Sequence, residues 1–233
     1  MAAGGMSVRA VLLDVDFTLC RPGPELSAER YGRIAARHGI VLDVERYEEA
    51  REAAALDLKR HPELLHDDTI WHRFTQDIFV RMGGPQELAS ECATEIEQGW
   101  EVSENFELYE DVLPVLEELR RAELRLGLVS NGIRDLHEFV AHHRLDVDAI
   151  VGSRAHGYVK PHPTIFQAAL GQLGVAPAEA VMVGDSLEED VEGARALGMR
   201  AILVDRGDRH PDVAERLTDL YGLPAALGLA RPT

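Results

Sequence analysis

Two aspartates, Asp14 and Asp16, stand at the end of a short apolar segment that begins at Arg9. Carboxylates at positions i and i+2 just beyond a buried strand can both face a cavity, because the chain there leaves the pleat that sends alternate side chains to opposite faces. Oxygen ligands of this kind suit a hard cation. An Asp-x-Asp sequence also occurs in ordinary turns, so the pair by itself leaves both interpretations open.

Further polar residues stand after the later apolar segments or at the start of a predicted helix. In chain order they are Ser130, Asn131 and Gly132, then Lys160, and finally Asp185 and Asp190. Carboxylates, a hydroxyl, a lysine and free backbone amides can together neutralise and orient the equatorial oxygens of a transferring phosphoryl group. This set of residues, in this order, predicts phosphoryl-transfer chemistry.

The elements that must position these residues alternate between strands and helices. Five apolar segments, each ending in polar or glycine residues, predict strands at Arg9–Asp14, Leu124–Val129, Ala149–Val151, Ala180–Val183 and Ala201–Val204. Helical patterns lie between them at Pro114–Ala122, Asp135–His143, Pro163–Leu173 and Leu187–Leu197. Right-handed βαβ crossovers then predict an α/β fold with a doubly wound parallel sheet, whose ligands lie beyond the carboxyl ends of the strands.

The segment from Arg21 to Phe106 interrupts this alternation, since it shows no convincing strand. Its amphipathic patterns predict helices near Ser27–His38, Asp43–Arg60, Asp67–Met82 and Pro85–Trp100. The candidate N-caps are Ser27, Asp43 and Asp67 or Asp68, and the candidate helix stops are Gly39 and Gly83-Gly84. We expect residues 1–20 and 107–233 to form a Rossmann-like catalytic core and residues 21–106 to form an inserted helical cap beside the site. One more surface helix is expected after Pro211.

Four aromatic residues of the inserted segment, Trp71, Phe74, Phe79 and Trp100, are assigned first to packing within the cap. The alternative is that one of them lines the substrate pocket. Charged residues in the loops that should border the cavity are candidates for recognising an anionic leaving group, with an ordinary surface role as the alternative; they are Arg21, Arg134, Arg154 and His156.

The composition excludes several classes of partner. The chain has 24 Lys and Arg against 41 Asp and Glu, a formal net charge of −17, which argues against binding to nucleic acid or to an anionic membrane. Cys20 and Cys92 have no CxxC spacing, so no zinc site or disulfide framework is indicated, and a reducing cytoplasm is expected. We expect no export signal and no membrane anchor, because the sequence shows no apolar run of about 18 residues. The oligomeric state does not follow from the sequence.

In four motifs the chain resembles the haloacid dehalogenase superfamily of hydrolases. These are DVDFTL at Asp14–Leu19, VSNG at Val129–Gly132, KPHP at Lys160–Pro163 and GDSLEED at Gly184–Asp190, in the order usual for the family. The motifs and their flanking strands cover about two thirds of the chain, and the rest resembles the helical cap that family members insert after the first strand. The resemblance implies a magnesium-dependent mechanism with an aspartyl-phosphate intermediate.

Roles for individual residues follow from this resemblance. Asp14 would attack phosphorus, Asp16 would protonate the leaving oxygen and later activate water, and Thr18 would help to position Asp16. The Asp14 carboxylate, the Asp16 main-chain carbonyl and Asp185 would hold Mg²⁺. Ser130 and Lys160 would hold the phosphoryl oxygens, Asn131 and Gly132 would bind substrate, and Asp190 would orient Lys160 or a metal-bound water. Phe17 departs from the family pattern, because members frequently have Gly there, and its side chain should narrow the pocket mouth or pack under the cap.

The second aspartate distinguishes branches of the family. Expelling an alkoxide requires a proton donor, and the dehalogenase branch characteristically lacks a carboxylate where Asp16 stands. The sequence therefore favours a phosphatase acting on a small phosphorylated metabolite. A phosphosugar mutase or another hydrolase of the family is the alternative. A phospho-receiver switch, which is not an enzyme, is a second alternative, but receivers are about half this length and carry the phospho-acceptor on a later strand.

Overall fold

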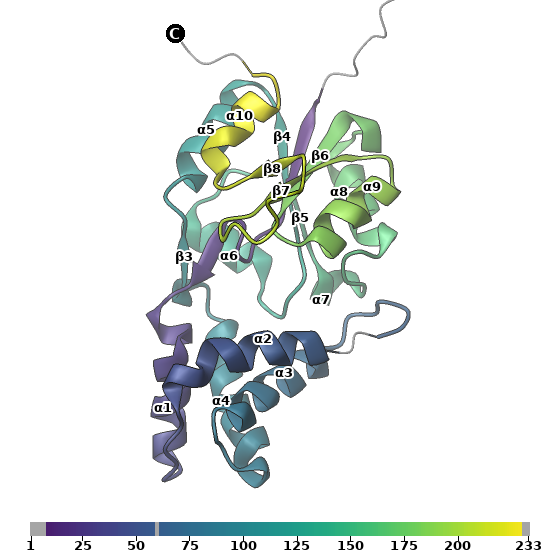
Figure 1. Cartoon of the computed structure of the whole chain (residues 1–233). Helices are drawn as coiled ribbons and strands as arrows, with labels where there is room; N and C mark the ends of the chain where they lie inside the picture. The colour runs from purple at the N-terminus through teal and green to yellow at the C-terminus, as the bar shows by residue number, and fades with distance from the viewer. Residues whose placement is uncertain (1–7, 59–60, 230–233) are drawn as a thin grey trace, which may run out of the picture. The chain divides into compact units, whose positions relative to one another are not determined.

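The computed structural model describes residues 8–58 and 61–229. Within these ranges the chain divides into two compact units. The first, here called the sheet unit, comprises the chain up to residue 21 with 108–132 and the residues from 136 onward. The second, called the helical unit, comprises residues 22–107 and 133–135. Figure 1 shows the elements of both units along the chain.

Six parallel strands form the main sheet in the described part of the sheet unit, in the order β5-β4-β1-β6-β7-β8. Their bounds are β1 (Ala10–Leu13), β4 (Arg125–Ser130), β5 (Ala149–Gly152), β6 (Ala180–Gly184), β7 (Arg200–Val204) and β8 (Arg216–Leu217). The four side chains of β1 are fully buried, as expected for a parallel strand covered on both faces. Because β1 lies between β4 and β6, the strand order reverses beside it, and the crevice beyond its carboxyl end is a place for a ligand.

Helices cover both faces of this sheet. They are α5 (Val112–Arg121), α6 (Leu136–His143), α7 (Ser153–His156), α8 (Pro163–Leu173), α9 (Gly193–Ala196) and α10 (Leu223–Ala226), with a π-helical turn at Leu187–Glu192. Figure 1 shows α5 and α10 on one side of the sheet and α8 and α9 on the other. The buried face of α8 packs Ile165, Phe166 and Ala169 into the core against strand residues such as Leu12 and Met182. The predicted α/β fold with a doubly wound parallel sheet is confirmed.

The end of the sheet unit differs from the prediction of a surface helix after Pro211. Residues Arg216 and Leu217 form β8, which pairs with β7, and the short helix α10 follows. Backbone bonds from Leu203 N to the Glu215 carbonyl (2.9 Å) and from Asp205 N to the Leu217 carbonyl (2.7 Å) hold this strand. A strand of two residues is too short to show an alternating pattern, so the sequence carries no signal for it.

The described residues of the helical unit form four α-helices, α1 (Ala28–Arg37), α2 (Tyr47–Asp57), α3 (Asp68–Arg81) and α4 (Ala89–Trp100). Tyr31, Ile34, Ile78, Phe79 and Ile96 are among the side chains that form its core. Figure 1 shows the four helices packed together. The unit therefore has an apolar core of its own.

The helix ends of this unit follow local capping chemistry. Asp43 and Asp67 accept hydrogen bonds from the backbone N–H groups of Glu45 (3.2 Å) and Thr69 (2.9 Å), as predicted for N-caps. Gly39 and Gly83 adopt the left-handed conformation, with φ of 75° and 98°, as predicted for stops. Ser27 differs, because its hydroxyl donates to the Pro24 carbonyl (2.7 Å) and makes no capping bond to α1.

Two short strands lie where the chain passes from one unit to the other. β2 (Cys20–Pro22) pairs with β3 (Phe106–Leu108) in a two-stranded ribbon among the described residues. The prediction of no strand between Arg21 and Phe106 is therefore wrong at both ends of that segment, because each strand has three residues and its partner is remote in sequence. Within the described ranges, no helix has the length and apolar character needed to cross a bilayer.

Candidate active site

The carboxylate of Asp14 lies just beyond β1, in the middle of the sheet, and the residue is 6% exposed. Its Oδ2 accepts a hydrogen bond from the Thr18 hydroxyl at 3.0 Å, and its Oδ1 accepts one from Lys160 Nζ at 2.6 Å. The backbone N–H of Asp14 donates to the Val183 carbonyl on β6 at 2.9 Å. A side chain held by a hydroxyl and an ammonium group has a defined orientation, which a nucleophile needs.

The loop after β1 is built around an unusual backbone conformation at Phe17. Its φ of 62° lies in the left-handed region, which costs a residue with a Cβ about 1–2 kcal/mol and which glycine adopts readily. The Phe17 N–H donates to the Cys20 carbonyl at 2.7 Å, and the Leu19 N–H donates to the Val15 carbonyl at 2.8 Å. The Phe17 side chain is 38% exposed. The backbone conformation gives a physical reason for the glycine frequent at this position in the family.

Thr18, the next residue of this loop, is fully buried. The family resemblance predicts that Thr18 positions Asp16. In the structure its hydroxyl donates to Asp14, so it orients the first carboxylate of the motif. The Asp16 carboxylate extends toward the loop after β4, because a Cβ added to Gly132 would lie 3.9 Å from Asp16 Oδ2.

Lys160 joins two carboxylates inside the core. Its side chain is 1% exposed, and Nζ donates to Asp14 Oδ1 and to Asp190 Oδ1, both at 2.6 Å. Asp190 Oδ2 accepts a further bond from the Ser186 N–H at 3.0 Å. Burial alone would lower the pKa of Lys160, but the two aspartates raise it above its ordinary value. Lys160 therefore carries its positive charge at neutral pH.

Three carboxylates gather at this point. Oxygen atoms of Asp14, Asp185 and Asp190 all lie within 4.8 Å of one another. Burial, together with repulsion from Asp190, raises the pKa of Asp14 to about 7 although Lys160 opposes the shift. Burial, together with repulsion from Asp14 and Asp190, raises the pKa of Asp185 to about 8. Such a cluster of oxygen ligands with excess negative charge fits a small divalent cation, which would relieve the repulsion.

The residues after β4 contact the lysine loop. Asn131 Oδ1 accepts the Lys160 N–H (2.7 Å), while its Nδ2 donates to the Lys160 carbonyl (3.1 Å) and to Glu189 Oε2 (2.8 Å). The Gly132 N–H, which the sequence analysis expected to be free for substrate, donates to the Ser153 hydroxyl at 3.1 Å. Ser130, the last residue of β4, is buried. Asn131 therefore helps to place the backbone that carries Lys160.

Ser153 and Glu189 belong to this network although the sequence pattern assigns them no role in the site: it places Ser153 at the end of a predicted strand and Glu189 on a solvated helix face, whereas Glu189 accepts the bond from Asn131. Ser153 directly follows β5, and Glu189 lies four residues after Asp185. Both stand after the carboxyl ends of strands, so their place in the topology was the available signal. Ser153 contacts Gly132, which is 21 positions away in sequence, and Glu189 contacts Asn131, which is 58 positions away. No local pattern of residues reveals such contacts.

The four charged loop residues that the sequence offers as candidates for recognising a leaving group differ in their contacts. The Arg134 guanidinium stacks 3.7 Å from the centroid of the Phe106 ring, and His156 Nε2 lies 2.9 Å from the Thr164 hydroxyl. The Arg21 guanidinium lies 5.8 Å from the centroid of the Tyr109 ring, and Arg154 is exposed.

The four aromatic residues of the inserted segment take part in packing within the helical unit. Phe79 is fully buried, and Phe74 and Trp100 pack against the core of this unit. Trp71 makes an edge contact with Phe74.

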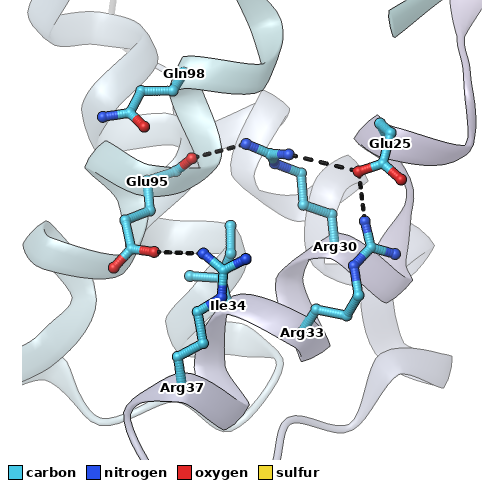
Figure 2. Close-up of a pocket in the computed structure, with 7 residues that line it drawn as sticks. All are labelled: Glu25, Arg30, Arg33, Ile34, Arg37, Glu95 and Gln98. Atoms are coloured by element: carbon cyan, nitrogen blue, oxygen red, sulfur yellow. Dashed lines mark hydrogen bonds and ion pairs between the residues drawn. The ribbon is translucent and has the colours of Figure 1, made fainter.

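The helical unit contains a small polar pocket of its own, with a volume of about 120 Å³. Figure 2 shows its lining, Glu25, Arg30, Arg33, Ile34, Arg37, Glu95 and Gln98. Arg33 pairs with Glu25 at 2.7 Å and Arg37 pairs with Glu95 at 3.2 Å. The Arg30 guanidinium donates to the Glu95 carbonyl oxygen at 2.9 Å. Each of its three arginines thus contacts a carboxylate or a carbonyl oxygen of the pocket itself, and none of the motif residues lines the pocket.

Residues 8–198 match the model of a family of hydrolases described as haloacid dehalogenase-like hydrolase. The chain belongs to this family. As a haloacid dehalogenase-like hydrolase it is an enzyme, and the phosphatases among its relatives support the hydrolysis of phosphate esters.

Two curated relatives of this hydrolase match over nearly their whole length. A phosphoserine phosphatase of Thermus thermophilus is 34% identical, and the alignment covers 91% of this chain and 94% of the relative. A glyceraldehyde 3-phosphate phosphatase of Methanopyrus kandleri is 32% identical, with coverage of 91% and 90%.

Solved structures of the family share the fold. The crystal structure of a HAD phosphatase from Thermococcus onnurineus has a TM-score of 0.67 and 28% identity, covering 97% of this chain and all of that one. A 2-haloacid dehalogenase from Pseudomonas syringae has a TM-score of 0.63 and 25% identity, covering 95% and 98%. Both phosphatases and dehalogenases are thus among the structural relatives.

Proposed function

We propose that this protein is a magnesium-dependent phosphatase that hydrolyses a small-molecule phosphomonoester through an aspartyl-phosphate intermediate. The observation that carries the proposal is the buried Asp14 carboxylate, which Thr18 and Lys160 orient and which lies within 4.8 Å of the carboxylate oxygens of Asp185 and Asp190. A positioned nucleophile beside a lysine and an acidic cluster is what phosphoryl transfer requires.

In the proposed reaction the two carboxylates of the first motif, Asp14 and Asp16, have separate roles. An oxygen of Asp14 attacks phosphorus and forms a P–O bond, while the bond to the leaving oxygen breaks and that oxygen takes a proton from Asp16. Asp16, now ionised, accepts a proton from water as that water attacks the phosphoaspartate. The P–O bond to Asp14 then breaks, and phosphate leaves. Lys160, with Ser130, holds the phosphoryl oxygens.

The buried acidic cluster of Asp14, Asp185 and Asp190 supports the proposal of a divalent metal at this site. The carboxylates of Asp14 and Asp185 and the main-chain carbonyl of Asp16 would hold Mg²⁺, since hard oxygen ligands suit this ion. When bound, Mg²⁺ neutralises charge on the carboxylates and on the phosphoryl group. Asp190, which also belongs to the cluster, acts through its 2.6 Å contact with Lys160.

Asp16 supports a phosphatase rather than a dehalogenase. Halide is a good leaving group without protonation, whereas an alkoxide needs a positioned acid. The relatives named for phosphoserine and glyceraldehyde 3-phosphate hydrolysis point to a small phosphorylated metabolite as substrate. We further propose that the segment 21–106 acts as a cap that selects among such substrates, while the phosphoryl chemistry stays with the sheet unit.

The test uses an aryl and an alkyl phosphate with two matched variants. Asp14→Asn should abolish Mg²⁺-dependent turnover and any covalent phosphoenzyme on both substrates. Asp16→Asn should lower kcat about 10²- to 10⁴-fold on the alkyl phosphate and much less on the aryl phosphate, whose leaving group needs little protonation. Asp146→Asn, at a carboxylate that is 82% exposed, is the control and should keep wild-type rates.

Two results would contradict the proposal. Undiminished turnover in excess chelator would show that the reaction does not need the metal. Equal losses on both substrates in the Asp14 and Asp16 variants would show that the two carboxylates do not have separate roles.

A further inference from the structure

Arg206 follows β7 and reaches the catalytic loop that follows β1. Its Nη2 donates to the main-chain carbonyl of Thr18 at 2.9 Å. Strand β6 lies between β1 and β7 in the sheet, so the arginine side chain joins two loops that are not neighbours in the strand order. The contact spans 188 positions in sequence.

The guanidinium is itself held from several directions. Nη1 and Nη2 donate to the two carboxylate oxygens of Asp111 at 2.9 and 3.0 Å, a bidentate pair of the kind that fixes orientation. The guanidinium carbon lies 3.8 Å from the centroid of the Tyr109 ring. Asp111 is 1% exposed and also accepts the Leu220 N–H at 2.6 Å. A planar cation anchored by this pair and this ring has little freedom, so its bond to Thr18 is well directed.

The residue whose carbonyl Arg206 holds is the residue that orients the nucleophile. The Thr18 hydroxyl donates to Asp14 Oδ2 at 3.0 Å, and the preceding residue, Phe17, has the left-handed φ of 62°. A loop with a strained residue keeps its conformation only where surrounding contacts hold it. Arg206 supplies such a contact at the Thr18–Leu19 peptide group, one residue beyond Phe17.

We propose that Arg206 is a positioning residue for the phosphatase reaction, which acts through Thr18 to hold the Asp14 carboxylate in its attacking orientation. Arg206 reaches Thr18 through its main-chain carbonyl, and Asp111 and Tyr109 hold the guanidinium in place. The inference rests on the proposed function, because the role of Asp14 as nucleophile belongs to that function.

The experiment compares Arg206→Gln and Arg206→Lys with Arg200→Gln as a matched control. Arg200 is the first residue of β7, the strand that precedes Arg206, and its Nε pairs with Glu215 at 2.7 Å on the surface. Each protein is assayed for kcat and KM with an aryl phosphate at saturating Mg²⁺, and its melting temperature is measured. We expect Arg206→Gln to lower kcat about tenfold or more with KM changed by less than about threefold, since small misplacement of a reacting group slows chemistry more than binding. Arg206→Lys, which keeps one donor for the Thr18 carbonyl, should recover part of the loss, and Arg200→Gln should keep the wild-type kcat.

A double-mutant cycle separates positioning from general stability. In a Thr18→Val background, which lacks the hydroxyl, Arg206→Gln should lower kcat by much less than in the wild type, because the path to Asp14 is already broken. Asp111→Asn keeps Arg206 but weakens the ion pair that holds its guanidinium, so its kcat should lie between those of the wild type and Arg206→Gln. This variant tests the proposal if Arg206→Gln does not fold.

The outcomes are distinct. Equal effects of Arg206→Gln in both backgrounds, or a fall in melting temperature with the kcat of the folded enzyme unchanged, would overturn the role of Arg206. An intermediate kcat for Asp111→Asn and partial rescue by lysine would support it. Absence of Mg²⁺-dependent turnover in the wild-type protein would instead contradict the proposed function, and so the two failures are distinguishable.

Discussion

At the residue scale, the site depends on a position that has no side chain. Gly184 ends β6, and a Cβ added there would lie 2.2 Å from Asp190 Oδ2 and 2.3 Å from its Cγ. Asp190 cannot move aside easily, because Ser186 and Lys160 hold both of its oxygens and its side chain is 1% exposed. Gly184→Ala should therefore displace Asp190 and with it Lys160. We expect kcat to fall about 10- to 10²-fold and the free energy of unfolding to fall by about 1–3 kcal/mol, measured by steady-state kinetics and urea unfolding.

The control for this prediction is Gly171→Ala. Gly171 lies on the exposed face of α8, where an added Cβ meets nothing within 4 Å. The same change there should leave kcat unaltered and raise the stability by up to about 1 kcal/mol, since alanine is the better helix former. A Gly184→Ala enzyme with wild-type kcat would show that the placement of Asp190 against Lys160 is not needed.

At the element scale, the connection from β7 to β8 is organised by one buried carboxylate. Asp205 accepts hydrogen bonds from the backbone N–H groups of Arg209 (2.9 Å) and His210 (2.7 Å) and from Arg216 Nη1 (3.0 Å). Burial alone would raise the pKa of Asp205, but these donors lower it below its ordinary value. The ionised form thus stabilises the fold above the unfolded-state pKa of about 4, and this contribution is lost as the pH falls through the lower folded-state pKa.

Asp205→Asn should accordingly lower the free energy of unfolding at pH 7 by about 1.5–3 kcal/mol, the range for hydrogen bonds to a charged group. The difference from the wild type should narrow as the pH falls below about 4, because the wild-type carboxyl then becomes protonated. Urea unfolding at several pH values measures this. Asp208→Asn, at an exposed carboxylate of the same loop, should cost much less at every pH. A pH-independent difference for Asp205→Asn would contradict the assignment.

At the scale of the whole molecule, the acidic cluster should make stability depend on both pH and metal. The pKa values of Asp14, about 7, and Asp185, about 8, lie above the value near 4 of the unfolded chain. In that interval the folded protein binds more protons than the unfolded chain, so the metal-free protein should lose stability as the pH rises from about 4 to 8. In the proposed site Mg²⁺ would bind the ionised forms of these carboxylates, so adding Mg²⁺ should raise the melting temperature more at pH 8 than at pH 6.

Calorimetry with chelator and with Mg²⁺ at both pH values measures this dependence. Asp185→Asn is the informative variant, since it should be more stable than the wild type in chelator at pH 8 and should lose most of the Mg²⁺-dependent rise. An equal rise at pH 6 and pH 8 would contradict the linkage between metal binding and these two carboxylates.

The helical unit, as a whole, should govern the choice of substrate if it acts as the cap. Trp71, Phe74 and Trp100 are partly buried, and Trp71 makes an edge contact with Phe74 at 6.3 Å between ring centroids. Replacing each by Ala in turn should change the ranking of preferred phosphorylated metabolites for at least one of them, while aryl phosphate turnover falls far less than in Asp14→Asn. Leu56→Ala, at a side chain that is 88% exposed on α2, is the control. An unchanged ranking in all folded variants would contradict the role of the cap.

The sequence by itself determined the elements and the residues to examine. Buried strands are local apolar runs, capping residues and glycines end helices locally, and a parallel sheet gathers its strand ends at one edge. For this reason the five longer strands, α8 with its bounds Pro163–Leu173, and the caps at Asp43 and Asp67 could be predicted. The family also followed, because its four motifs are local stretches of chain.

The tertiary structure decided which atoms of those residues meet. It placed the Thr18 hydroxyl on Asp14, the Asn131 amide on the backbone of Lys160 and the Arg206 guanidinium on the Thr18 carbonyl. It also paired β8 with β7 and β2 with β3, although each of these short strands is too brief to carry a periodic signal. These contacts depend on the relative positions of loops that are far apart in sequence. Such positions are set by how the sheet and its helices pack, which no local pattern of residues specifies.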